Sequence, residues 1–96
     1  MENEIYFNSL YDYYKNLLTD KQQTYYEEYY FNNLSLAEIS EIYGVSRNAV
    51  HKQLKEIFNK LEEYENKLNL YENARQIKKL LKNIDEETRQ KIEKLI

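Results

Sequence analysis

The chain has 96 residues and a net charge of −3, a length that suits one domain and is too short for two. It contains no cysteine, which excludes disulfides and thiolate chemistry, and no proline and a single glycine, a composition typical of an all-helical fold. No apolar run reaches the roughly 20 residues of a membrane span, and the acidic, polar start is unlike a signal peptide, so we expect a cytoplasmic protein.

The first helix is expected over residues 3–18. Apolar side chains recur there at three- and four-residue steps and predict one buried stripe, made of Ile5, Leu10, Tyr13, Tyr14, Leu17 and Leu18. Thr19 or Asp20 can cap a second helix that runs to about Phe31. That helix carries a broad aromatic face, made of Tyr25, Tyr26, Tyr29 and Tyr30. Such a face is either a packed core or a stacking platform for unpaired bases, and we favour the core.

A helix-turn-helix is expected over residues 35–54. Ser35 and Glu38 match a capping box at the start of a short helix, which ends at Gly44, the residue best able to adopt a left-handed conformation. Ser46 can cap the next helix only two residues later. Apolar side chains are expected to lock the corner, namely Ile39, Ile42 or Tyr43, Val45, Val50 and Leu54. This geometry leaves the first turns of the second helix exposed, ready to enter a major groove.

Polar and basic side chains at the start of the second helix are the expected nucleic-acid-binding residues, namely Ser46, Arg47, Asn48, His51, Lys52 and Lys55. Arg47 can bind guanine and Asn48 can bind adenine through paired hydrogen bonds. Lys52 and Lys55 suit phosphate contacts. His51 can donate to a base or to a phosphate. The free amides at the N-terminus of this helix can also hold a phosphate.

The distribution of charge supports the same surface. Residues 1–43 carry eight acidic and two basic side chains, residues 44–82 carry five and nine, and residues 83–96 carry four and three. The positive excess therefore begins at the turn of the motif, where a polyanion-binding surface needs it. Two alternatives stay open, an ordinary helical corner with solvated lysines and a helix-turn-helix fold that binds protein.

A long helix is expected after the turn. Its apolar residues are spaced alternately by four and three and form a heptad seam, namely Val50, Leu54, Ile57, Leu61, Tyr64, Leu68 and Tyr71. The phase slips near Asn73 and Ala74, where the helix is expected to bend or restart. The second half of the seam either pairs with a second chain or is covered by the terminal helices. We favour a homodimer in which residues 57–84 form the dimerisation helix, with an interface of Leu61, Tyr64, Leu68 and Tyr71.

The last helix is expected to start at Asp85, with Ile92, Leu95 and Ile96 as its apolar face. Together these elements predict an all-α fold of about five or six helices. The single histidine lacks the partners of a metal site, and the adjacent pairs Glu27–Glu28 and Glu62–Glu63 point to different helix faces. No nucleophile motif or glycine-rich phosphate loop occurs. The sequence therefore predicts a protein that is not an enzyme and needs no cofactor or metal.

Three segments resemble the YlxM family of small bacterial helix-turn-helix proteins, namely NLSLAEISE at 33–41, VSRNAV at 45–50 and YENKLNLY at 64–71. The resemblance covers about residues 5–80. The helix-turn-helix is also similar to region 4 of sigma factors, whose corresponding segment reads promoter DNA. The resemblance implies an all-helical, sigma region 4-like fold in which Arg47 and its neighbours contact DNA.

Members of that family are encoded beside genes of the signal recognition particle pathway. The resemblance therefore implies a regulatory DNA-binding protein linked to that pathway. Two alternatives remain at this point. One is an accessory factor that binds the RNA of the particle or its protein GTPase, and the other is an interaction module that binds no nucleic acid. The resemblance implies no catalytic residue.

Overall fold

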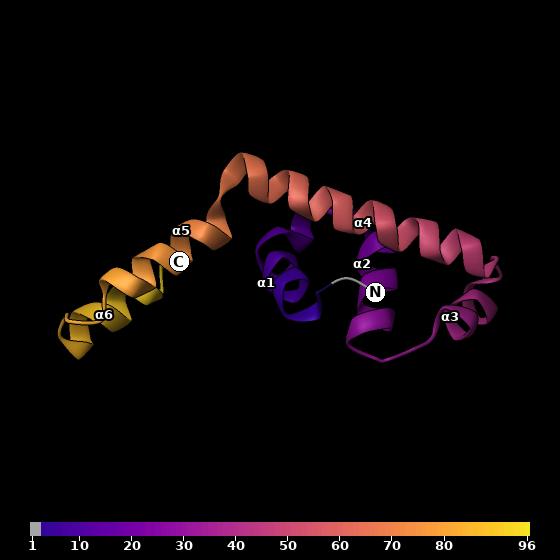
Figure 1. Cartoon of the computed structure of the whole chain (residues 1–96). Helices are drawn as coiled ribbons and strands as arrows, with labels where there is room; N and C mark the ends of the chain where they lie inside the picture. Colours follow the sequence, from indigo (N-terminus) through magenta and orange to yellow (C-terminus); the bar gives the residue numbers. More distant parts are fainter. Residues whose placement is uncertain (1–2) are drawn as a thin grey trace.

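The computed structural model of the chain describes residues 3–96, so that Met1 and Glu2 of the expected single domain lie outside the described residues. Those residues form α-helices and one short 3-10 helix and contain no strand, which confirms the all-α fold. The elements are α1 (Glu4–Tyr14), η1 (Lys15–Leu17), α2 (Asp20–Tyr30), α3 (Leu36–Tyr43), α4 (Arg47–Leu68), α5 (Leu70–Leu80) and α6 (Glu86–Glu93). The first three α-helices lie along one side of α4, and the last two project beyond it (Figure 1). No helix within residues 3–96 combines the length and the apolar character that crossing a bilayer requires.

Aromatic side chains join α1 and α2 to α4 in the core. The rings of Tyr11 and Tyr26 stack with their centroids 4.2 Å apart. The ring of Phe58 on α4 contacts Phe7 of α1 and Tyr30 of α2 at centroid distances of 5.0 and 5.9 Å. Pairs of this kind contribute about 0.5–1.5 kcal/mol each beyond the area that they bury. The tyrosines of α2 therefore serve the core, which is the use that we favoured from the sequence.

The first helix is shorter than expected, and the predicted stripe is confirmed only in part, with Leu10, Tyr14 and Leu18 buried. It ends at Tyr14, and η1 then leads the chain toward α2, so residues 3–18 are not one continuous helix. Ile5 is 83% exposed and Leu17 is 52% exposed, whereas Phe7 and Tyr11 are buried. Ile5 lies about 200° around the helix from Phe7, so the two cannot share a face. The stripe prediction was wrong for Ile5 and Leu17 because the larger aromatic side chains take the core-facing positions.

The long helix ends earlier than the heptad seam predicts. It stops at Leu68, and Asn69 adopts a left-handed conformation with φ of 54° before α5 begins at Leu70. The break therefore lies at Asn69 and not near Asn73 and Ala74, where it was expected. Asparagine tolerates positive φ better than most residues other than glycine. One residue is thus enough to end one helix and start the next.

A buried carboxylate stabilises this junction. Glu65 accepts hydrogen bonds of 3.0 Å from the backbone amides of Tyr71 and Glu72 and one of 2.6 Å from the Tyr14 hydroxyl. The Tyr14 oxygen in turn accepts from the amide of Leu70 at 3.0 Å. These groups supply the cap that the residue before α5 does not provide. The negative charge also lies at the positive end of the α5 dipole, which favours it there.

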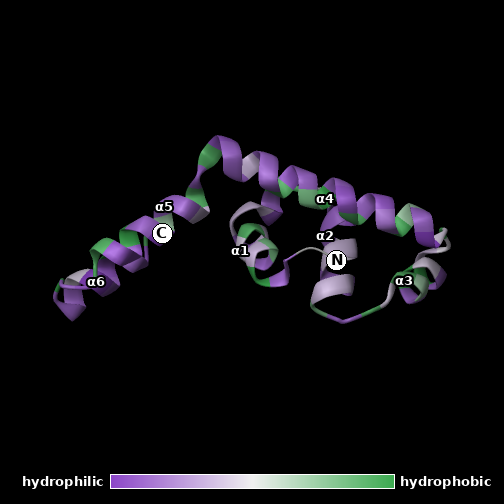
Figure 2. Ribbon diagram, viewed as in Figure 1, coloured by the Kyte–Doolittle hydropathy of each residue, from purple (hydrophilic) through white to green (hydrophobic). Residues whose placement is uncertain are grey.

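Helices α5 and α6 form an arm, defined here as residues 70–96, that extends past the body of α1–α4. The radius of gyration is 16.5 Å, against about 12.5 Å for a compact chain of this length. Asp85 caps α6 as expected, by accepting from the amide of Thr88 at 2.9 Å. Hydrophobic residues recur along the arm between hydrophilic ones (Figure 2). Leu80 is 78% exposed and Leu95 is 84% exposed, so Leu95 does not join the apolar face expected for the last helix.

Candidate nucleic-acid interface

The bounds of α3 are set by a cap at each end. The Ser35 hydroxyl accepts from the amide of Glu38 at 3.0 Å, and the Glu38 carboxylate accepts from the amide of Ser35 at 3.1 Å, so the capping box is confirmed. At the other end Gly44 has φ of 66°, as expected. The amide of Val45 then donates to the carbonyl of Ser40 at 3.1 Å, the six-to-one bond of a Schellman turn. These bonds end α3 sharply and reverse the chain toward α4.

The start of α4 follows this turn directly. The Ser46 hydroxyl accepts from the amide of Ala49 at 3.1 Å and so acts as the predicted N-cap. Three residues of the expected lock, Ile39 of α3 and Val50 and Leu54 of α4, have no exposed surface. Burial of each such side chain contributes about 1.5–3 kcal/mol relative to an exposed one. The two helices of residues 35–54 are therefore fixed relative to each other by caps and by packing.

Tyr43 rather than Ile42 completes the lock. The Tyr43 ring packs edge-on against Tyr25 of α2 at 5.3 Å, and its hydroxyl donates to the Glu28 carboxylate at 3.3 Å. Partial burial and the neighbouring charge of Glu28 raise the pKa of Tyr43. Ile42 is 58% exposed and takes no part in the corner. The helix-turn-helix is thus attached to α2 as well as packed within itself.

The predicted nucleic-acid-binding side chains of α4 are all exposed, namely Arg47, Asn48, His51, Lys52 and Lys55. Three of them, Arg47, Asn48 and His51, line a hollow of about 430 Å³ together with Leu36 at the start of α3. Lys52 and Lys55 do not line it. Leu36 was not among the expected site residues, because it lies beside the first turns of α4 only through the packing of the two helices.

The electrostatic environment of this hollow is positive. The first turn of α4 contains no acidic side chain, so the positive end of the helix dipole adds to the charge of Arg47. No acidic side chain that the structure describes lines the hollow, and the Glu38 carboxylate at the start of α3 accepts a hydrogen bond from the Ser35 amide. Within residues 3–96 no group of three or more histidine or carboxylate side chains could hold a metal ion. The hollow therefore suits an anionic ligand. The planar guanidinium of Arg47 and the planar side-chain amide of Asn48 can donate hydrogen bonds to it.

The residues of the expected dimer interface pack mainly within their own chain. Leu61 has no exposed surface. The Tyr64 hydroxyl donates to a backbone carbonyl of η1 at 3.2 Å, and the Tyr71 ring packs edge-on against Tyr6 of α1 at 5.5 Å. Only Leu68, which is 49% exposed, is largely accessible to a second chain. The N-terminal elements α1 and η1 thus cover part of the seam, and the pairing of two chains stays a prediction.

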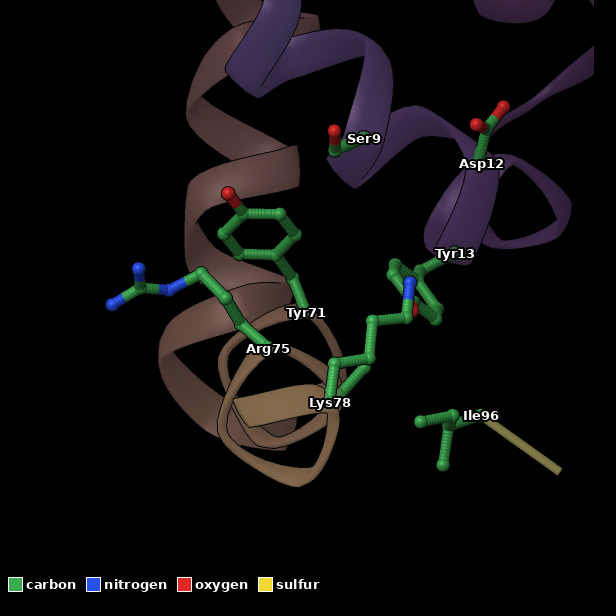
Figure 3. A pocket seen from close by; sticks show the side chains of 8 residues that line it. Ser9, Asp12, Tyr13, Tyr71, Arg75, Lys78 and Ile96 are labelled. Atoms are coloured by element: carbon green, nitrogen blue, oxygen red, sulfur yellow. The ribbon is translucent and has the colours of Figure 1, made fainter. Parts of the chain in front are cut away.

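A second hollow, of about 400 Å³, lies between α1 and the arm (Figure 3). We call it the α1–α5 groove, and its lining residues are Ser9, Asp12, Tyr13, Tyr71, Ala74, Arg75, Lys78 and Ile96. The sequence did not reveal it, because it joins side chains about 60 positions apart and depends on the bend of the chain at Asn69. The only signal in the sequence was the basic charge of residues 75–82.

Comparison with known proteins agrees with this geometry. Three UPF0122 proteins, from Streptococcus gordonii (strain Challis) and from the Hungary19A-6 and CGSP14 strains of Streptococcus pneumoniae, are each 54% identical to this chain over 48 residues. The match covers 50% of this chain and 44% of each relative, so it spans less than half of their length. The family described as "Putative helix-turn-helix protein, YlxM / p13 like" matches residues 1–96, and its description names no reaction. The chain belongs to this YlxM/p13-like family of helix-turn-helix proteins.

Proposed function

We propose that this protein is a DNA-binding regulator that reads duplex DNA with the first turns of α4. The observation that carries the proposal is the exposed group of Arg47, Asn48 and His51. It lies in the first turns of α4, a helix that is anchored in the core by the fully buried Val50 and Leu54. A helix anchored in this way can enter a major groove without disturbing the core.

Each exposed side chain has a distinct role in this proposal. The guanidinium of Arg47 donates to N7 and O6 of a guanine, and the amide of Asn48 pairs with an adenine. Such a bidentate pair discriminates against the wrong base by about 1–3 kcal/mol. Lys52 and Lys55, farther along α4, bind phosphates and set the orientation of the helix on the duplex. His51 donates to either kind of group.

A salt series tests the proposal. The purified protein is titrated with a mixed-sequence DNA duplex of about three helical turns at increasing salt concentration. Lys52 and Lys55 contact phosphates in this proposal, and Arg47 and His51 add positive charge in the groove. The log of the association constant should therefore fall against the log of salt with a slope between about −2 and −4. Undetectable binding at low salt, or an affinity that salt does not change, would rule out this reading of α4.

We further propose that the regulatory role belongs to the signal recognition particle pathway, on the basis of the family resemblance. The alternative is an accessory factor that binds the RNA of the particle or its protein GTPase. The basic residues of the arm favour the RNA form of this alternative, because they provide cationic surface outside the helix-turn-helix. Titration with the RNA of the particle under the same conditions as the duplex separates the two. Binding to neither polymer would favour a module that recognises protein.

We also propose that the protein acts as a homodimer, which would bring two recognition helices to two half-sites. The support is a stripe on the arm with heptad spacing, which we call the α5 stripe, formed by Leu70, Asn73, Ile77, Leu80 and Ile84. Leu70 is 45% exposed, Leu80 is 78% exposed and Ile84 is 41% exposed. An asparagine within such a seam commonly sets the register of self-pairing helices. This surface, with Leu68 beside it, replaces the fully buried Leu61 of the expected interface.

A further inference from the structure

The α1–α5 groove is lined by two half-buried aromatic rings whose positions are fixed by the core. The Tyr71 ring rests edge-on against Tyr6 at 5.5 Å, and the Tyr71 amide is bonded to Glu65. The Tyr13 ring lies 6.3 Å from the ring of the buried Tyr14. Rings held in this way lose little freedom when a planar ligand stacks on them. Stacking of a base on an aromatic side chain is sequence-tolerant and is a main source of affinity for unpaired strands.

Two cations lie one helical turn apart at the edge of the same groove. Arg75 pairs with Glu72 through its Nε and one terminal nitrogen, at 3.1 and 3.2 Å. Since a guanidinium has five N–H donors, these bonds leave others for a ligand. The Lys78 side chain makes no hydrogen bond or ion pair with any residue that the structure describes. Figure 3 shows Lys78 reaching toward Tyr13, while the Arg75 guanidinium points to the other side of Tyr71. Lys78 can therefore bind a phosphate at the groove.

The groove also offers hydrogen-bond acceptors. Asp12 of α1 lines it with an exposed carboxylate. Ser9 uses its hydroxyl proton in a 3.0 Å bond to the carbonyl of Ile5, which leaves its oxygen to accept. A matching ligand must bring a planar ring, an N–H donor and a negative charge. A nucleotide supplies all three in a single residue, whereas an acidic residue of a peptide supplies only the charge.

We propose that the α1–α5 groove binds one nucleotide of a single-stranded nucleic acid. The phosphate lies at Lys78, the base stacks against Tyr13 or Tyr71, and an amine of the base donates to Asp12. A volume of about 400 Å³ lies within the usual range for small-ligand sites. The ligand of this groove, an unpaired nucleotide, thus differs from the duplex DNA proposed for the helix-turn-helix.

This site is separate from the proposed duplex-reading surface. Helix α4 spans the distance between them with 22 residues, or about 33 Å. Glu62 and Glu63 are exposed on α4 between the basic residues of its first turns and those of the arm. The nucleotide proposal does not rest on the reading of DNA by Arg47. An experiment can therefore rule out either proposal without ruling out the other.

Amide chemical shifts of the full chain test the proposal with four probes. These are inorganic phosphate, adenosine monophosphate, a mixed-sequence single-stranded RNA of about eight nucleotides, and a mixed-sequence DNA duplex. The RNA and the nucleotide should shift the amides of Ser9, Tyr13 and Ala74, and the RNA should bind more tightly because its neighbouring phosphates reach the other cations of the arm. Arg47→Ala should leave this binding unchanged.

Lys78→Glu and Lys79→Glu form a matched pair, since both residues are exposed on α5 and only Lys78 lines the groove. Lys78→Glu should weaken RNA binding about tenfold, and Lys79→Glu by less than about threefold, because only the first removes a direct charged hydrogen bond. Equal losses in the two variants would overturn the proposal in favour of general surface charge. The proposal would also be overturned if inorganic phosphate were the only probe that shifts the amides of the groove, or if no probe shifted them.

Discussion

The Tyr14 hydroxyl donates to the Glu65 carboxylate across 2.6 Å and so ties α1 to the junction between α4 and α5. Tyr14 is 1% exposed and Glu65 is 6% exposed. A carboxylate can be buried at this depth because the Tyr14 hydroxyl and two backbone amides donate to it. The direction of the arm is therefore set by the core of the protein and not by a free hinge at Asn69.

Replacing Glu65 should destabilise the fold by removing this cap. Glu65→Gln keeps the shape of the side chain but loses the charge and one acceptor oxygen, so the free energy of unfolding should fall by about 1–3 kcal/mol. Urea unfolding followed by far-UV circular dichroism measures the change. Glu62→Gln is the control, because Glu62 is exposed on the same helix and its replacement should change stability by less than about 0.5 kcal/mol. Equal unfolding midpoints for the two variants would mean that the cap contributes nothing.

The same hydroxyl should make stability depend on pH in the alkaline range. Burial, and then the hydrogen bond to Glu65, raise the pKa of Tyr14 to about 12, above the value of about 10 for an unfolded tyrosine. A raised pKa means that the contribution of Tyr14 is fully present below pH 10 and is lost as the pH rises toward 12.

Tyr14→Phe provides the comparison for this pH dependence. Burial also raises the pKa of Tyr11 and Tyr26, so the natural protein should lose stability above pH 10 in any case. The phenylalanine variant should lose less, because one of the titrating groups is gone. Urea unfolding of both proteins between pH 9 and pH 12 measures the two slopes. Parallel curves would show that Tyr14 titrates equally in the folded and unfolded states.

Gly44 should stabilise the turn of the helix-turn-helix because it adopts a positive φ without strain, and not because a side chain would lack space. A Cβ atom added there meets no atom within 4 Å, but φ is 66°. Gly44→Ala should therefore cost about 1 kcal/mol of stability from backbone strain, and Gly44→Asn should cost less because asparagine tolerates this region. Thermal unfolding measures both variants. An alanine variant as stable as the natural protein would contradict a strained turn.

Local signals in the sequence were enough to predict the helix-turn-helix. The bonds that define it join Ser35 to Glu38 and Ser46 to Ala49, three positions apart, and Gly44 ends α3 by its own conformation. Patterns of this range depend little on the rest of the fold. Arg47 is exposed because it is the first residue of α4; its helical spacing from Val50 did not require this, since residues three positions apart share a face.

Features that depend on distant contacts could not be predicted in this way. The heptad seam continues to Tyr71 in the sequence, yet Glu65 and Tyr14, which are 51 positions apart, cap a new helix at Leu70. The α1–α5 groove exists only because the chain bends at Asn69, between α4 and α5. Ile5 was wrongly placed in the core for the same reason, since the aromatic residues of α2 and α4 decide which face of α1 is buried.

The arm should mediate self-association if the α5 stripe is the dimer surface. Leu80→Glu should shift the protein from dimer to monomer, because it buries a charge in an apolar contact. Leu95→Glu should leave the mass unchanged, since Leu95 is equally exposed but lies outside the stripe. Sedimentation equilibrium measures both. A natural protein that is already monomeric, or a Leu80→Glu variant that remains dimeric, would rule out this surface.

Substitution of Leu61 should lower the stability of the monomer and should not act through the dimer interface. Its side chain has no exposed surface within its own chain, so Leu61→Asp should unfold or strongly destabilise the monomer. Far-UV circular dichroism and sedimentation of the same sample distinguish loss of helix from loss of mass. A folded Leu61→Asp monomer obtained from a natural dimer would instead restore Leu61 to the interface.

The most direct measurement compares Arg47→Ala with Lys67→Ala for binding to a DNA duplex selected from a randomised library. Each variant removes one positive charge from an exposed position on α4, at its opposite ends. If Arg47 reads a base, Arg47→Ala should weaken binding about tenfold or more and relax the preference at one base pair, while Lys67→Ala should change affinity by less than about twofold. Equal losses of affinity, with the sequence preference unchanged, would contradict the reading of DNA by the first turns of α4.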